Sequence, residues 1–259
     1  MPWRTALSGN KSENTFHFND SLFNQRLALA RDLVDDDHAA WWSSDSITAL
    51  QPHHLDSLDD TWFVLSEPTA RRIFYGRYFP ETNTYTIKYS FTMSDSHAIA
   101  LPPSETSDTV TLFARAVYFG DRYFDHLLDS LMLDFPFNHY IRRNPDNTFI
   151  LRYLPAGTGN LCAYGTEIIL QLAETGDSLL STTLTGNELK YVEFSNTPEA
   201  LELDNTFDEV PSIGNIFFTL SFIREFPVIS IINQESISIA RMSETDTSGR
   251  VSWEHVQRQ

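Results

Sequence analysis

The octet HHLDSLDD at residues 53–60 holds two histidines and three aspartates. Within it, His54 and Asp56 form an H-x-D pair, and on a strand this spacing places both side chains on one face, as in the two-histidine, one-carboxylate iron site of non-haem oxygenases. The candidates for the second histidine and for a basic residue that binds an oxoacid cosubstrate are His97, His139, Arg115 and Arg142. Pro52 and the neighbouring aspartates fit a turn better than a strand, so we expect a solvated loop and no bound metal.

Three of the five tryptophans, Trp41, Trp42 and Trp62, fall close together in the sequence. Indole rings offer flat apolar faces on which sugar rings stack. The cluster is therefore a candidate for ligand stacking in a carbohydrate-binding module. Packing in the core or at a subunit interface explains the same cluster equally well.

Other acidic and nucleophilic residues are weaker candidates for chemistry. Asp35–Asp37 lacks the alternate spacing and central glycine of a calcium loop, so we expect an exposed acidic helix end. Cys162 has no histidine near it in sequence, and we expect a small buried residue rather than a nucleophile. Glu167, Glu188 and Glu193 are possible glycosidase acids, but acids in strands more often face solvent. The chain has no G-x-S-x-G elbow, and we expect no cofactor and no enzyme activity.

The first element that must position these residues is a helix. Asn19 or Asp20 caps it, apolar residues recur at spacings of three and four up to Val34, and Asp35–Asp37 is expected to end it because negative charge opposes the dipole of a helix C-terminus. A second helix is expected from Asp121, with Pro136 just beyond its end.

The remaining elements are expected to be strands. Residues 71–79 and 84–91 form a predicted hairpin around the turn 80–83, and Gly76 indicates a bulge or a close neighbour. In the second strand, period-two alternation places Tyr85, Ile87, Tyr89 and Phe91 on one face. Further strands are expected at 109–119, 148–154, 161–173 and within 214–241, where the apolar segment 216–222 is expected to lie between two layers.

These elements predict an all-β protein with two short helices. Helices do not alternate with strands, which disfavours a parallel sheet and favours an antiparallel β-sandwich, with a jelly roll as one form. We expect an N-terminal arm at residues 1–18, a single sandwich domain at 19–241 and a polar C-terminal tail at 242–259.

Both terminal segments carry isolated large aromatic residues. A free tail has no use for a tryptophan, whereas an arm that docks on a neighbouring subunit does, because one buried tryptophan anchors a segment. The alternative is that the tails fold back on their own domain. The expected assembly anchors are Trp3, Phe16, Phe18 and Trp253.

Charge and hydropathy exclude several classes of partner. The formal net charge is −17, so we expect no direct binding to nucleic acid and no docking on an anionic membrane. One cysteine excludes an intrachain disulfide. The first twenty residues lack an apolar core, so we expect synthesis in the cytoplasm without a signal peptide, with a virion as one later destination.

The sequence therefore favours a non-enzymatic structural subunit of a larger assembly, such as a virion shell, tail or neck component. Its partners would be other protein subunits, in a homo-oligomer or a hetero-oligomer. The alternatives are a carbohydrate-binding sandwich that uses the three tryptophans and a non-haem metal enzyme that uses His54 and Asp56.

Overall fold

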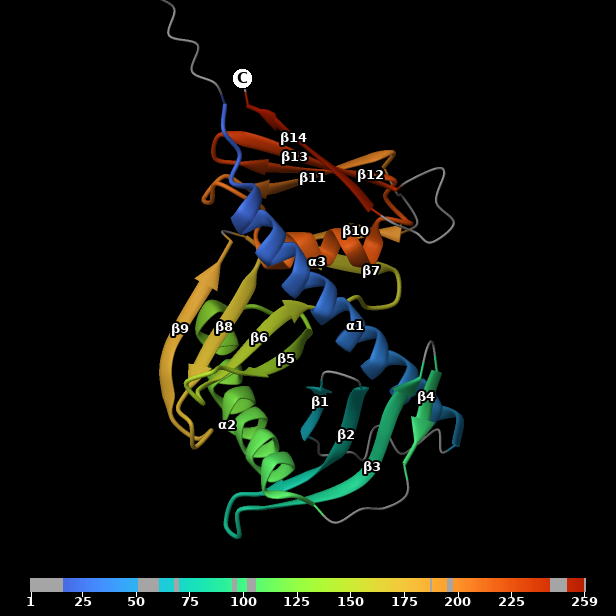
Figure 1. Ribbon diagram of the computed structural model, residues 1–259, viewed down its shortest axis with the longest axis vertical. Coiled ribbons are helices and arrows are strands. Elements are labelled where there is room, and N and C mark those ends of the chain that lie inside the picture. The colour runs from blue at the N-terminus through green and yellow to red at the C-terminus, as the bar shows by residue number, and fades with distance from the viewer. Residues whose placement is uncertain are drawn as a thin grey trace, which may run out of the picture.

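The structure is a computed structural model of the 259-residue chain. The residues that it describes are 16–50, 61–67, 70–94, 97–101, 106–186, 188–194, 198–242 and 251–258. Within these residues the chain forms three helices and fourteen strands (Figure 1). The helices are α1 (Asp20–Leu50), α2 (Asp108–Leu131) and α3 (Ile213–Phe222). The strands are β1 (Thr61–Glu67), β2 (Ala70–Phe79), β3 (Thr84–Ser94), β4 (His97–Ala100), β5 (Phe137–Arg143), β6 (Phe149–Pro155), β7 (Leu161–Tyr164), β8 (Glu167–Leu172), β9 (Leu179–Thr185), β10 (Lys190–Glu193), β11 (Ala200–Asn205), β12 (Val228–Asn233), β13 (Ser236–Met242) and β14 (Val251–Gln257).

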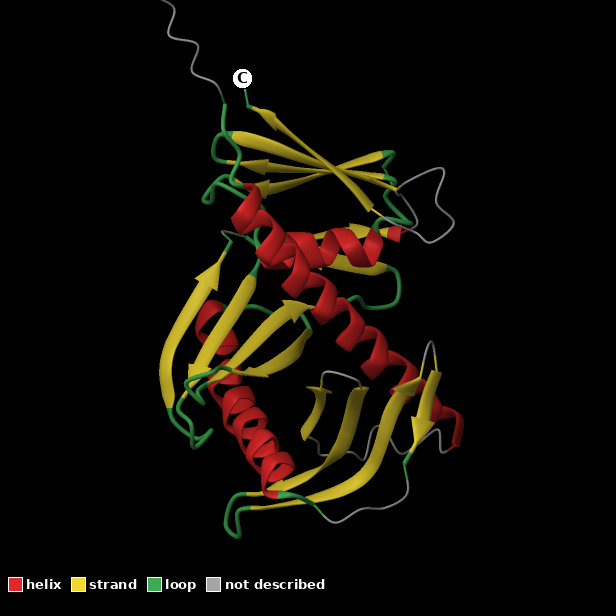
Figure 2. Cartoon of the chain, viewed as in Figure 1, coloured by secondary structure: helices red, strands yellow, loops and turns green. Residues whose placement is uncertain are grey.

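The strands form four separate sheets (Figure 2). The first sheet has the order β1-β2-β3-β4, the second β5-β6-β8-β9 and the C-terminal sheet β11-β12-β13-β14, while β7 and β10 form a two-stranded sheet. Neighbouring strands are antiparallel except β11 and β12, which are parallel. The parallel pair is possible because α3 lies between these two strands in the sequence and provides the crossover.

The predicted hairpin is confirmed, with Phe79 opposite Thr84. The register shifts beside Gly76, and a side chain there would collide with the Thr86 carbonyl, so both expectations for this glycine hold. The prediction that the apolar residues of β3 share one face is wrong. The shift leaves Lys88 without an opposite residue, so the side chains change faces at that point.

As a result, the first sheet has two apolar faces. One face, with Phe63, Phe74 and Tyr85, packs against α2, and the other, with Ile73 and Phe91, packs against α1. The first sheet therefore lies between two helices.

Helix α2 fills the space between the first and second sheets. Its buried residues contact both Phe63 of the first sheet and Phe149 and Leu151 of the second. The helix begins at Ser107, whose hydroxyl accepts a hydrogen bond from the backbone N–H of Val110, as an N-cap residue does.

The strand predicted at 109–119 is wrong, because these residues form the first half of α2. The β-branched residues of TVTLF favour a strand locally. The buried residues Val110, Phe113, Ala114 and Val117 nevertheless follow the helical spacing of three and four, and burial of that face between two sheets outweighs the local preference.

Helix α1 does not end at the acidic run but continues to Leu50. The prediction that Asp35–Asp37 ends it is wrong because two arginines from the sheets neutralise this part of the helix. Asp36 is buried and forms ion pairs with Arg71 and Arg142. An unfavourable dipole interaction at an exposed site costs only about 0.3–1 kcal/mol, which such partners offset.

The segment 216–222 forms α3 rather than the predicted strand. Ser212 is its N-cap and accepts from the backbone N–H of Asn215. A helix that is apolar on all sides must be buried, and α3 is enclosed by α1, β7 and the C-terminal sheet. Its placement between layers agrees with the expectation, although its conformation does not.

The predicted polar tail at 242–259 contains strand β14, which pairs with β13 along its whole length. The tail prediction is therefore wrong for residues 251–257. In the predicted N-terminal arm, residues 16–18 are described, and Phe18 is buried against β14. Residues 1–15 lie outside the described residues.

The chain is mainly β-sheet with three helices, and its sheets are predominantly antiparallel, as the all-β prediction expected. The finer prediction of a sandwich or jelly roll is not confirmed. Helix α2 lies between the first and second sheets, and none of the described sheets closes on itself.

The packing of α2 gives a test of this arrangement. Gly120→Ala in a helix interior ordinarily stabilises by about 1 kcal/mol. Here the new Cβ would lie 2.5 Å from Leu151 Cδ2 and 3.1 Å from the Tyr153 hydroxyl. We expect Gly120→Ala to lower the free energy of unfolding by about 1–3 kcal/mol in urea denaturation, because overpacking a core forces side chains off their rotamers.

The double variant Gly120→Ala/Leu151→Ala is the control. Leu151→Ala alone should cost about 2–5 kcal/mol. Removal of the leucine methyls gives the Cβ room, so the double variant should lose clearly less stability than the two single losses together. Additive losses would contradict the packing of α2 on β6.

Candidate functional site

The described residues form an open groove of about 670 Å³ with an aromatic lining. We call it the aromatic groove. Residues of α1, β1, β2, β5 and α3 line it, so it depends on the meeting of a helix, two sheets and a second helix. The lining residues are Asp37, His38, Ala40, Trp41, Ser44, Trp62, Tyr75, Asn138, Gly157, Ser221 and Phe222.

Two of the three tryptophans of the predicted cluster line the aromatic groove. Trp41 is 59% exposed, and Trp62 stacks on His139 with 4.6 Å between ring centroids. Trp42 is half-buried on another side of α1, beside His38. The structure thus brings Trp41 and Trp62 together and separates Trp42 from them.

Hydrogen bonds hold the walls of the groove in place. The Tyr75 hydroxyl donates to the Ala40 carbonyl at 2.9 Å and lies 2.8 Å from the Ser43 hydroxyl, which joins β2 to α1. Burial raises the pKa of Tyr75 to about 12, so it stays a neutral hydrogen-bonding group. One carboxylate oxygen of Asp37 accepts from Asn138 and from Tyr140, which joins α1 to β5.

The polar character of the groove is acidic. Asp37 places a carboxylate in the lining, and no lysine or arginine occurs among its described lining residues. A wall with two indoles, a tyrosine ring and hydrogen-bonding groups fits a ligand with flat apolar faces and several hydroxyls or donors.

A cluster of acids and arginines, the α1 ion-pair cluster, holds the helix beside the groove. It consists of Asp32, Asp36, Arg71 and Arg142, with N–O distances of 2.5–2.9 Å. Burial raises the pKa of Asp36 even though Arg142 and Arg71 favour its charged form. Arg71 comes from β2 and Arg142 from β5, so the cluster joins one helix to two sheets.

His139 lies in a second buried polar group. Its Nε2 is 2.7 Å from the Trp62 carbonyl, and its Nδ1 is 3.3 Å from Asp121, which also accepts from the Tyr153 hydroxyl. A carbonyl and a carboxylate both accept, so both ring nitrogens serve as donors. Burial disfavours the imidazolium, but the Asp121 charge and the two hydrogen bonds outweigh it, and the pKa of His139 is raised.

The predicted metal residues do not come together in the described part of the chain. His54 and Asp56 lie outside the described residues, so the metal-enzyme hypothesis stays a prediction there. Arg115 pairs with Asp177, and Arg142 belongs to the α1 ion-pair cluster. Among the described residues, no group of three or more His, Cys, Asp or Glu could hold a metal ion.

One of the three candidate enzyme acids and the cysteine have structural surroundings, whereas Glu188 and Glu193 are exposed. Glu167 forms a buried ion pair with Arg152, and its other oxygen accepts from the Gly214 N–H at 3.0 Å. Burial lowers the pKa of Arg152 to about 10, so the guanidinium remains charged at neutral pH. Cys162 is buried, and burial raises its pKa to about 11, so it is a thiol at neutral pH, as expected for a structural residue.

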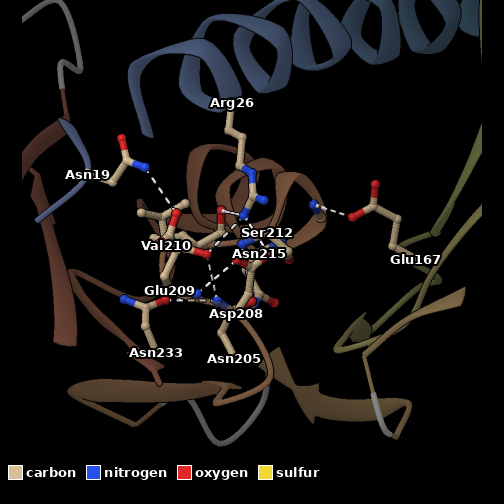
Figure 3. Close-up of polar contacts among 12 residues, drawn as sticks. Asn19, Arg26, Glu167, Asn205, Asp208, Glu209, Val210, Ser212, Asn215 and Asn233 are labelled. Carbon is tan, nitrogen blue, oxygen red and sulfur yellow. Dashed lines mark hydrogen bonds and ion pairs between the residues drawn. The ribbon is translucent and has the colours of Figure 1, made fainter. Parts of the chain in front are cut away.

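A buried polar junction, absent from the sequence-based hypotheses, lies between α1, α3 and the C-terminal sheet (Figure 3). Asn205 donates to the Asn233 side chain and the Val210 carbonyl, both at 2.8 Å. The side-chain oxygen of Asn205 accepts from the backbone N–H of Ser212 and from the side-chain amide of Asn215. In each of two strands, an asparagine continues the alternate positions that carry buried apolar residues, and this was the available signal, because buried amides require partners.

Arg26 closes this junction from the side of α1. It pairs with Asp208 at 2.7 Å and donates to the carbonyls of Val210 and Pro211 at 3.0 and 3.1 Å (Figure 3). These bonds fix the loop 206–212 between α1 and the C-terminal sheet. Every amide described in the junction has partners, so the junction is structural.

The described terminal aromatics have contacts within the chain. Phe18 stacks on His255 at 3.7 Å between centroids, and Trp253 packs edge-on against Phe23 at 5.2 Å. Phe16 is partly buried against the same group, and Trp3 lies outside the described residues. Their role as assembly anchors stays a prediction.

Strand β9 is a second candidate surface. It forms one edge of the second sheet, and six of its seven residues are exposed. Leu179, Leu180 and Leu184 are 37%, 55% and 47% exposed. The strand contains no charged residue.

The chain matches no family model, no curated protein and no solved structure. The geometry of the described residues therefore carries the functional argument. Among those residues, no helix has the length and apolar character that a membrane crossing requires.

The buried His139 predicts a pH dependence of stability. Its folded-state pKa is above the unfolded value of about 6.5, so its stabilisation is complete below that pH and is lost as the pH rises through the folded-state pKa. The free energy of unfolding should therefore fall above about pH 6.5 in the wild type, and this fall should be smaller in His139→Gln. Each unit of raised pKa corresponds to about 1.4 kcal/mol.

His255→Gln is the matched control. Burial lowers the pKa of His255 below its unfolded value of about 6.5. The contribution of His255 to the free energy of unfolding is therefore complete above about pH 6.5 and is lost as the pH falls below that value, which is the opposite of His139. Urea unfolding between pH 5 and pH 9 separates the two histidines. Parallel curves for wild type and His139→Gln above pH 6.5 would refute the role of the imidazolium.

Proposed function

We propose that this protein is a non-enzymatic structural subunit of a larger protein assembly, of the kind found in a virion shell, tail or neck. The observation that carries the proposal is the outer edge of β9, with which no strand among the described residues pairs. Its work would be mechanical, since a strand edge and its side chains bury surface against a neighbouring subunit.

An uncovered strand edge is costly for a protein that acts alone. Its free N–H and C=O groups template pairing with other chains, so monomers protect edges with charges, prolines, short strands or a covering segment. The seven residues of β9 include no charge and no proline. Its own residues thus lack the charges and prolines that protect an edge, and no strand of the described part of the chain pairs with its outer side.

The side chains of β9 favour burial as well. Leu184 lies opposite Ile168 of β8 and shares the face that carries the core of the second sheet, yet it is 47% exposed. Full burial of a leucine contributes about 1.5–3 kcal/mol. A neighbouring subunit would continue this core beyond the edge of the sheet.

The proposal predicts that the protein is found in a complex. In native material, mass photometry and electron microscopy should show particles heavier than the 29.7 kDa chain. Thr183→Lys places a charge on the β9 edge and should reduce the fraction in complexes at least tenfold.

Gln25→Lys adds the same charge on an exposed position of α1 and should leave the complex intact. A chain that is monomeric in native material and at high concentration would contradict the proposal. Equal behaviour of the two variants would exclude β9 as the contact.

A carbohydrate-binding module is a second candidate function, favoured by the meeting of Trp41 and Trp62 in one groove. Stacked rings there would lie beside Asp37 and Asn138, which offer hydrogen-bonding groups to sugar hydroxyls. The groove is open, as required for an extended oligosaccharide.

The tryptophans give this alternative a matched pair of variants. If an oligosaccharide binds, Trp41→Ala should weaken binding at least tenfold, since a stacked indole contributes both apolar area and ring contact. Trp42→Ala, on the same helix but outside the groove lining, should change binding less than threefold. A glycan array without binders, or equal effects of the two variants, would rule the module out.

A further inference from the structure

We infer that β9 pairs antiparallel with β9 of a second copy of this chain. The four-stranded second sheets of the two copies then form one continuous eight-stranded sheet. This inference rests on the proposed function and names the partner of the same edge. The partner is specified by the chemistry of the strand: an exposed, uncharged edge that is complementary to itself.

The backbone of β9 supplies the first part of the argument. Residues Glu167–Leu172 of β8 pair with one side of the strand. No described strand pairs with the other side, so a row of backbone donors and acceptors along Leu179–Thr185 faces outward. An antiparallel partner of the same length satisfies this row.

The order of side chains makes the strand self-complementary. With the two-fold axis at Thr182, Ser181 lies opposite the partner's Thr183. Leu180 is the residue at which the register between β8 and β9 shifts, and it lies beside the partner's Leu184. An isologous interface requires this kind of match: if one residue contacts a second residue of the partner, the second residue also contacts the partner's copy of the first. The match places leucine beside leucine and hydroxyl beside hydroxyl, both favourable cross-strand pairs.

Electrostatics favours this edge as the meeting point of two copies. Each chain carries a formal net charge of −17, so two copies repel through most of their surfaces. The ten residues 178–187 contain no charged side chain. Asp177 directly precedes this stretch, and its carboxylate is already paired with Arg115. Contact along β9 therefore brings no unpaired charge of the strand against its copy.

Other described edges are less suited to a symmetric contact. Strand β11 carries Glu202 and Asp204, so its self-pairing places carboxylates near carboxylates. Strand β4 has only four residues. The observations thus favour a second copy at β9 over self-pairing at β11 or β4.

The test uses opposite charges at the two-fold axis. In the purified full chain, sedimentation velocity should show a species of twice 29.7 kDa whose fraction rises with concentration. Thr182→Lys and Thr182→Glu each oppose like charges across the axis and should weaken the dimer at least tenfold. An equimolar mixture of the two variants should restore dimer formation to within threefold of the wild type, because the opposed charges then attract.

A crosslinking measurement covers the case in which a charged variant does not fold. Thr182→Cys should be joined to its counterpart by a short bifunctional thiol reagent, since directly opposite residues have Cβ atoms about 4.5–5.5 Å apart. Gln25→Cys on the exposed side of α1 should not be joined. The native Cys162 is buried and serves as the background in both variants.

The outcomes separate the inference from the proposed function. A purified chain that stays monomeric, or a dimer that neither charge variant weakens, would overturn the β9 pairing. If the chain then still enters heavier complexes in native material, the proposed function stands with a different partner at β9. If no complex forms in either setting, both fail.

Discussion

Most of the described structure depends on the ion pairs that hold α1 against two sheets. Asp32 and Asp36 lie one turn apart on the helix, and they bind Arg71 of β2 and Arg142 of β5 at 2.5–2.9 Å. Because Asp36 is buried, loss of either arginine would leave a carboxylate poorly compensated in the interior, which is far more costly than loss of an exposed pair. The position of the aromatic groove follows from this contact, since its wall includes Asp37 and Trp41 on the same helix.

Helix α1 also reaches the C-terminal sheet, where a different kind of contact holds it. There, Arg26 binds the loop 206–212, and the amides of Asn205 and Asn233 satisfy one another beneath it (Figure 3). Figure 1 shows α1 running from the C-terminal sheet to the first sheet. One helix thus joins three sheets, through ion pairs at its middle and a polar junction near its start. Such buried polar groups specify position, because a displaced donor or acceptor would lose its partner.

The helices also explain why β9 is uncovered. Helix α2 covers the faces of β6 and β8, where Leu151, Ile168 and Leu170 are buried, but the leucines of β9 remain exposed. The second sheet is therefore wider than the helix that covers it. This exposed strand is uncharged and carries three leucines, and it provides the surface on which both the proposed assembly function and the proposed self-pairing of β9 depend.

Acidic residues in this chain occur in two kinds of environment. Exposed acids give the net charge of −17, whereas Asp36, Asp121 and Glu167 are drawn into contacts with Arg, His or backbone groups. Sequence alone does not separate the two groups, because Arg71 lies 35 residues from Asp36 and Arg152 lies 15 residues from Glu167, which is farther than any local pattern reaches. Only the tertiary structure brings the opposite charges together.

The sequence by itself determined the strands with clear turns and alternation, the start of α1, the predominance of antiparallel sheet and the burial of Cys162. Local rules suffice there, since a turn and a period of two act between neighbouring residues. Tertiary structure alone decided the length of α1, the helical state of 109–119 and 216–222, the strand at 251–257 and the meeting of Trp41 with Trp62. For the two helical segments, burial against distant segments outweighed a local preference of less than about 1 kcal/mol per residue. In every case the deciding contact comes from a distant segment, which no local pattern encodes.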